Sequence, residues 1–158
     1  MKLIKAIATA FTLLACSMAF SQTRLTVTHD EIQAPTILDH GTPGQSIGDM
    51  RVWQFPGKSS DGQSVTIDWI MTTTGVMADS SSEYRISSAV FSFGSGTQDQ
   101  IVIQGVALYP SFKSTLDPSA STKRAITGGT GVFMGINGHM ESKHLTNGAG
   151  WVHELYFK

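Results

Sequence analysis

Few polar residues of this chain could do chemistry, and the most informative of them lies inside a predicted strand. Asp68 stands in the middle of Val65–Met71, where apolar and polar residues alternate most clearly. A carboxyl group buried in such a strand would resist ionisation, and its raised pKa would suit acid–base catalysis. The same alternation also allows Asp68 to face solvent, on the side opposite Ile67 and Trp69. The sequence leaves both orientations open.

His29 and Glu31 form the second candidate group. They lie two residues apart at the end of a predicted first strand, residues 25–29, and therefore share one face. They could form a polar patch at the mouth of a barrel, or be solvated as strand-end residues usually are. Gln54, near the end of the next predicted strand, could supply an amide that orients a ligand. We take Asp68, Glu31 and His29 as candidate catalytic residues and Gln54 as a candidate ligand-binding residue.

Large aromatic residues in the predicted strands could form the walls of a cavity, although core packing is the usual role of such residues. The candidates are Trp53, Trp69, Phe91 and Phe133. The five histidines have no metal-binding spacing, and residues 128–131 lack the lysine and the following helix of a phosphate-binding loop. We therefore expect no metal site and no phosphate-binding loop.

The elements that would position these residues are short strands. The chain has 158 residues, which indicates one domain, and it is rich in glycine and poor in charge. Turn signals at Asp61-Gly62, at 94–96 and at 146–150 separate about eight predicted strands, and no segment after residue 21 has a helical pattern. Pro56-Gly57 is predicted to end the second strand. The pattern predicts an all-β barrel or sandwich.

Charge and surface pattern restrict the partners. The net charge is −1 and no basic run occurs in the predicted mature chain, so nucleic acid is not an expected partner. Several strands, among them 100–109, carry apolar residues on both faces. This pattern predicts that part of the outer surface is covered by another subunit.

The first 21 residues are typical of a secretion signal. A short basic head precedes the apolar run 6–15, which is too short to span a bilayer, and Ala19-Phe20-Ser21 offers a cleavage site. Residues 22–158 would then be the mature domain, secreted or periplasmic in a bacterium. Leu13-Leu14-Ala15-Cys16 also fits a lipoprotein signal, which would anchor the chain through a lipid on Cys16. Because Cys16 is the only cysteine, the mature domain would have no disulfide.

The stretch Arg124–Ser142, RAITGGTGVFMGINGHMES, resembles the signature of allene oxide cyclases and is similar to the Gly-Gly-Thr-Gly-Lys/Arg-Phe element of dirigent proteins. Residues 92–94 and 100–105 are similar to the strand–turn–strand that precedes it in those proteins, and the resemblance covers most of residues 24–158. It implies an eight-stranded antiparallel β-barrel with a largely apolar cavity, which needs no cofactor and assembles as a homodimer or homotrimer. Within that fold, Gly135–Gly138 is predicted to bend one long strand, and Gly128–Gly131 to form the tight turn before it.

The resemblance also implies a function, because such barrels steer the cyclisation or coupling of a reactive small molecule. The plant cyclases carry a glutamate and an asparagine in the first strand, followed by Ser-Pro. The nearest matches here are His29 and Glu31, and Pro35 lacks the serine. We therefore expect an activity other than allene oxide cyclisation itself. The leading hypothesis is a secreted barrel that binds an apolar or aromatic small molecule and steers its cyclisation or coupling. The alternatives are a non-catalytic carrier of lipophilic ligands and a structural or interaction module.

Overall fold

The computed structural model describes residues 22–110 and 115–158, and the predicted signal peptide and Cys16 lie outside the described residues. The described chain is almost entirely β-structure, as predicted, and contains no helix long and apolar enough to cross a membrane. Its elements are β1 (Thr23–His29), β2 (Thr36–Leu38), β3 (Met50–Ser59), β4 (Ser64–Val76), β5 (Ser82–Phe93), β6 (Gln100–Pro110), β7 (Ser121–Thr130), the 3-10 helix η1 (Gly131–Phe133), β8 (Gly138–His144) and β9 (Trp151–Phe157).

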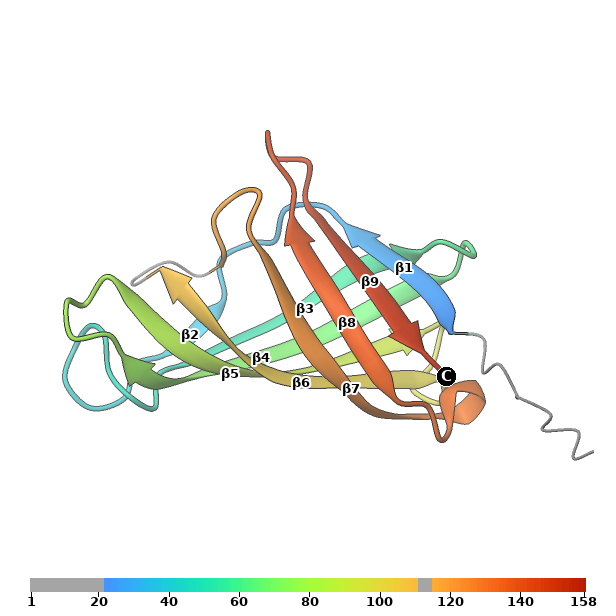
Figure 1. The fold of residues 1–158 in the computed structure, drawn as a ribbon, viewed down its shortest axis with the longest axis horizontal. Helices are drawn as coiled ribbons and strands as arrows, with labels where there is room; N and C mark the ends of the chain where they lie inside the picture. The colour runs from blue at the N-terminus through green and yellow to red at the C-terminus, as the bar shows by residue number, and fades with distance from the viewer. Residues whose placement is uncertain (1–21, 111–114) are drawn as a thin grey trace, which may run out of the picture.

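Eight of the strands close into an antiparallel barrel, which confirms the predicted architecture (Figure 1). The order is β1-β9-β8-β7-β6-β5-β4-β3, and β1 closes the circle by pairing with β3, where Val27 is opposite Ser59. The short strand β2 pairs with the first part of β3, on the same edge that pairs with β1, and places Thr36 opposite Val52.

Residue alternation decides what lies inside the barrel. In β4 the face formed by residues 65, 67, 69 and 71 is buried. One end of the interior is apolar, where Phe93, Ile101 and Phe157 pack close to η1. This end lies beside the C-terminus (Figure 1). Burial of these side chains is the main source of the stability of the barrel.

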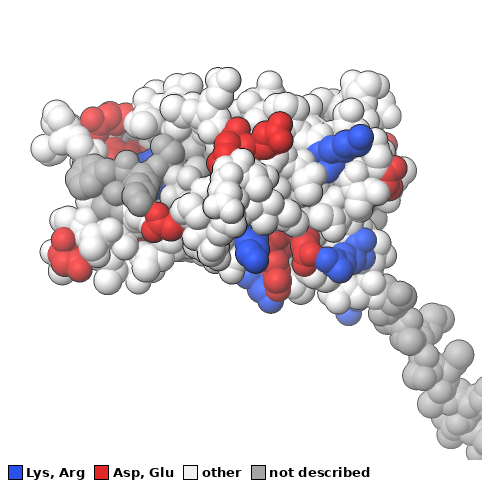
Figure 2. Space-filling view, turned by 90° about the horizontal axis from the view of Figure 1, so that it is seen from above, with Lys and Arg blue, Asp and Glu red and all other residues white. Residues whose placement is uncertain are grey.

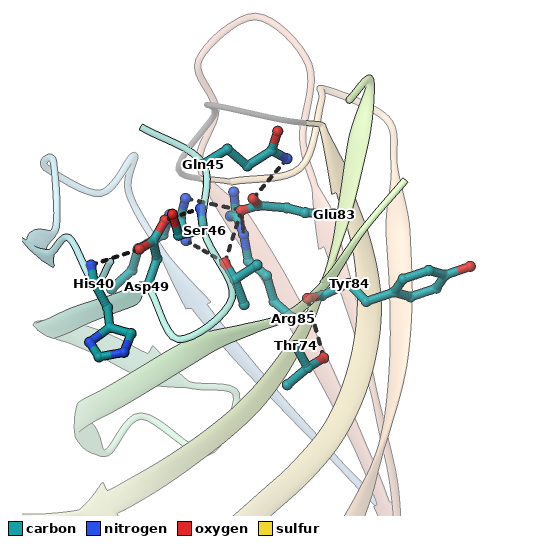
Figure 3. A network of polar contacts seen from close by, with 10 residues as sticks. His40, Gln45, Ser46, Asp49, Thr74, Glu83, Tyr84 and Arg85 are labelled. Carbon is teal, nitrogen blue, oxygen red and sulfur yellow. Dashed lines mark hydrogen bonds and ion pairs between the residues drawn. The ribbon is translucent and has the colours of Figure 1, made fainter. Parts of the chain in front are cut away.

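The other end of the interior is polar (Figure 3). Glu83 of β5 is fully buried between Arg85 and Arg51, whose Nη2 atom lies 3.0 Å from the Glu83 carboxylate. Gln45, from the loop before β3, donates to the other carboxylate oxygen at 3.0 Å. Buried charges are stable when each is paired and hydrogen-bonded, so this network closes one end of the barrel at low cost.

Pro56-Gly57 does not end a strand, contrary to the prediction, because β3 continues to Ser59. Proline removes one backbone donor, which matters only where that donor would enter a ladder. At Pro56, β3 pairs with β4 on one side, whereas its other side pairs only at 50–52 and 58–59. The missing N–H is therefore tolerated at this position.

The glycine-rich stretch is also different from the prediction, because it joins two strands and does not bend one. β7 ends at Thr130, η1 follows, and β8 begins at Gly138. Gly131 has a left-handed φ of 59°, and a Cβ atom there would lie 2.0 Å from a carboxylate oxygen of Asp99. At Gly138 a Cβ atom would lie 1.9 Å from the carbonyl oxygen of Tyr156. Close backbone approach therefore explains these glycines.

Candidate ligand cavity

A cavity lies inside the barrel, between the apolar end and the polar network. Its free volume is about 30 Å³, which is room for about two water molecules. All three tryptophans of the chain, Trp53, Trp69 and Trp151, form its walls. The remaining lining residues are His29, Ile32, Phe55, Met71, Tyr109, Thr115, Leu116, Thr122, Arg124, Ser142 and His153.

A chain of hydrogen bonds runs through two histidines of this cavity. The Nε2 atoms of His29 (β1) and His153 (β9) lie 3.0 Å apart, so one must donate to the other. Because Nδ1 of His29 lies 2.7 Å from the carbonyl oxygen of Asp30, it carries the proton, and Nε2 of a neutral His29 is then the acceptor. His153 therefore donates from Nε2, and its Nδ1 accepts from the Ser142 hydroxyl at 2.8 Å.

Burial keeps both of these rings neutral. It lowers the pKa of His153 well below the ordinary value, and the nearby His29 and Arg124 lower it further. Burial also lowers the pKa of His29, although the carbonyl of Asp30 and the charge of Glu31 oppose the shift. Both rings therefore act in the folded protein as neutral members of the hydrogen-bond chain that starts at the Ser142 hydroxyl.

Arg124 of β7 is the only cation among the described lining residues, and its side chain is buried. It donates to the hydroxyl groups of Tyr109 and Thr122, and its guanidinium lies 5.1 Å from the centre of the Trp69 ring. In the described chain no carboxylate forms an ion pair with it. Burial lowers its pKa, but an arginine stays charged inside proteins.

Three donors around the cavity have no acceptor within the described chain. They are Nε1 of Trp69, Nε1 of Trp151 and Nε of Arg124. The third tryptophan is different, because Nε1 of Trp53 donates to the carbonyl oxygen of Gln33 at 3.2 Å. Buried donors are rarely left without a partner, so these three indicate a place for an acceptor.

Glu31 helps to cover the cavity and does not line it. Its carboxylate lies 2.9 Å from Nε2 of His144, whose Nδ1 lies 2.7 Å from the carbonyl oxygen of Leu116. The His144 ring stacks on Trp151, with ring centres 4.4 Å apart. These contacts connect the segment after β1 with the segment before β7. The side chains of Ile32 and Leu116, which close the cavity, belong to these two segments.

The structure brings some of the predicted site residues together and leaves others apart. His29, Trp53 and Trp69 line the cavity, as their candidate roles required. Phe91 packs against Trp69 and His153 at the edge of the cavity but is not a lining residue. Phe133 lies at the apolar end against Phe93, with ring centres 4.8 Å apart, and is not a wall of the cavity.

Asp68 and Gln54 lie on the outer face of the barrel. The Gln54 amide donates to the Asp68 carboxylate at 2.7 Å, across the β3–β4 ladder. Asp68 thus takes the solvent-side orientation, because the larger apolar side chains of Ile67 and Trp69 occupy the interior. The acid–base role considered for it required a position in the cavity, so this geometry gives that role no support. Gln54 instead borders an outer groove beneath residues 29–36.

Sequence reasoning missed the residues that give the cavity its polar character, namely Arg124, Ser142 and His153. For His153 a signal was present, since Trp151, His153 and Leu155 alternate along one face of the last strand. For Arg124 no such signal exists, because an arginine in a strand is normally exposed.

Comparisons with known proteins support the fold. No protein-family profile and no curated protein matches the chain. A solved structure described as a pyocyanin demethylase is similar over 87% of this chain and 100% of that chain, with a TM-score of 0.58 and 23% identity. A dirigent protein described as a pterocarpan synthase is similar over 87% of this chain and 85% of that chain, with a TM-score of 0.54 and 18% identity. The chain therefore shares its β-barrel fold with these two proteins.

Proposed function

We propose that this barrel binds a small apolar or aromatic molecule in the cavity between its three tryptophans. The observation that carries the proposal is the wall itself, where three large aromatic side chains surround free volume inside the barrel and do not fill it. Aromatic walls with a few polar groups are typical of small-molecule sites. The two similar structures, a demethylase and a synthase, are also named for chemistry on small molecules.

Binding requires that the cover of the cavity move. Pockets for drug-sized ligands measure roughly 300–1,000 Å³, whereas the free volume here is about 30 Å³. Leu116 and Ile32 belong to segments between strands, so they are free of the ladders that hold the barrel wall. Displacing these two side chains opens the cavity without breaking a strand pair.

The polar groups at the cavity favour an enzyme over a carrier. The Ser142 hydroxyl, backed by the neutral His153 and His29 rings, lines the cavity and offers a polar contact to a bound molecule. The tryptophan walls would hold that molecule in one shape, which suits a cyclisation or coupling that depends on geometry. A carrier of lipophilic ligands is the second candidate, because the walls alone are sufficient for binding.

The test is a search for the ligand and for its place. Native mass spectrometry of the protein from its own host should show a bound small molecule, and toluene or naphthalene should change the tryptophan fluorescence. Leu116→Phe places a larger side chain in the cover of the cavity and should weaken binding of either probe at least tenfold. Val132→Phe, at an exposed position of η1 that does not line the cavity, is the control. A chain that carries no molecule and responds to neither probe would contradict the proposal.

We also propose that the chain is secreted, on the basis of the signal pattern in residues 1–21.

We propose in addition that the chain associates with copies of itself. The outer face of β4–β6 presents exposed apolar residues in cross-strand pairs, Ile86 opposite Val106 and Tyr84 opposite Leu108. Charged residues make up only 15% of the chain. On the face seen from above in Figure 2, which is not the β4–β6 face, charges of both signs are scattered without a continuous basic patch. A contiguous apolar face with few charges is typical of a protein interface.

A further inference from the structure

We propose that the cavity takes the anionic oxygen group of its ligand, a carboxylate or a phenolate, and that Arg124 with the indole N–H groups of Trp69 and Trp151 recognises it. The inference rests on the proposed small-molecule binding and narrows it to one chemical class of ligand. It follows from two features of the cavity, an uncompensated buried charge and a set of unused donors.

The uncompensated charge follows from a comparison of the buried cationic and anionic residues. Among the described residues these include three arginines and two acids, so the barrel carries one buried positive charge in excess when its histidines are neutral. Glu83 is held between Arg51 and Arg85. Asp49 accepts from the backbone N–H groups of His40 and Ser46, both at 2.9 Å. No acid is left for Arg124.

An unpaired buried cation is costly, and the described residues that line the cavity include no acid. Leaving one member of a buried ion pair without its partner typically costs several kcal/mol. His29 and His153 are neutral, and the hydroxyl groups of Tyr109 and Thr122 carry no charge. An anionic group on the ligand would therefore pair with Arg124, for which the described chain supplies no counter-charge.

The unused donors give the anion a place. Nε of Arg124 and Nε1 of both Trp69 and Trp151 are buried without an acceptor, although all three side chains line the same cavity. A carboxylate has two oxygens with about four acceptor sites, which is enough for three donors. The free volume of about 30 Å³ corresponds to about two oxygen-sized positions. Hydrogen bonds between a charged and a neutral group are stronger than those between neutral groups.

The experiment compares three probes that share one ring, by isothermal titration calorimetry. Benzoate carries the anion, benzamide is its neutral isostere, and toluene has no acceptor. We expect benzoate to bind at least tenfold more tightly than benzamide, as a charge-assisted hydrogen bond requires. Arg124→Met should remove this preference, whereas Arg24→Gln, which removes a surface charge, should retain it.

The tryptophans provide an independent test that does not disturb the arginine. Trp69→Phe and Trp151→Phe keep an aromatic wall but remove an unused donor, and each should lower the benzoate-to-toluene affinity ratio about tenfold. Trp53→Phe removes an indole whose N–H is already bonded to Gln33, so it should change this ratio least. These variants decide the matter even where Arg124→Met does not fold.

The outcomes separate this inference from the proposed function. Tight binding of toluene together with equal affinities for benzoate and benzamide would leave small-molecule binding in place and overturn the anion site. That result would mean that ordered water satisfies the three donors. Unchanged ratios in both Trp69→Phe and Trp151→Phe would overturn it as well. Failure of all three probes to bind, with unchanged tryptophan fluorescence, would overturn both proposals.

Discussion

Because His29 and His153 are buried and neutral in the folded protein, we expect the free energy of unfolding to decrease in mild acid. His153 is 1% exposed and its pKa is held well below the ordinary value by burial. The unfolded chain takes up a proton on this ring near pH 6.5, whereas the folded chain does not. Protonation therefore favours the unfolded state. The stability is complete above pH 6.5 and decreases as the pH falls toward the folded-state pKa.

The magnitude follows from proton linkage. Each proton bound only by the unfolded chain changes the free energy of unfolding by about 1.4 kcal/mol per pH unit. Between pH 6.5 and 5.0, His153 alone should therefore remove at most about 2 kcal/mol, and His29, whose pKa is lowered in the same direction, adds to this. For a domain with a typical total of 5–15 kcal/mol, such a loss is easily measured.

The assay is urea unfolding at several pH values, followed by tryptophan fluorescence. His153→Gln keeps an N–H directed at His29 but cannot titrate, so its slope between pH 5.0 and 6.5 should be smaller by about 1.4 kcal/mol per pH unit. Ile101→Val, at the apolar end, should lower the overall stability by about 1 kcal/mol and leave the slope unchanged. Equal slopes in wild type and His153→Gln would refute the reasoning.

Three further predictions address the buried network, the outer carboxylate of Asp68 and the exposed apolar face. Glu83→Gln leaves two buried arginines without their carboxylate and should lower the free energy of unfolding by about 3–5 kcal/mol in urea titrations; a loss below 1 kcal/mol would contradict the network. Asp68→Asn should change stability by less than about 0.5 kcal/mol and leave toluene binding intact, because this carboxylate lies on the outer face. Val106→Glu places a charge in the exposed apolar face and should convert the expected oligomer to a monomer in light scattering, whereas a wild-type monomer would remove the basis for self-association. All three variants should retain β-sheet circular dichroism.

Strand alternation allowed much of the fold to be predicted. A period of two fixes which residues of a strand share a face, so the two faces of β4 could be identified from residues 65–71. Local pattern gave wrong predictions at two places, where the contacts of a segment with distant parts of the chain decide its structure. Pro56 is accepted within β3 because only one edge of the strand is paired there, and the glycines after Thr130 form a connection because backbone atoms of distant segments pass close to them. Both features depend on neighbours that are distant in sequence.

By itself, the sequence determined the class of fold, the approximate strands and the presence of large aromatic residues on them, because these depend on local pattern. Only the tertiary structure decided the site. His29 and His153 are 124 residues apart and meet because β1 and β9 are neighbours in the closed barrel. Closure also decided that Asp68 lies outside and Arg124 inside, since alternation fixes relative faces but not which of them encloses the core. The cavity is therefore a product of strand register and barrel closure, which no single segment of the sequence specifies.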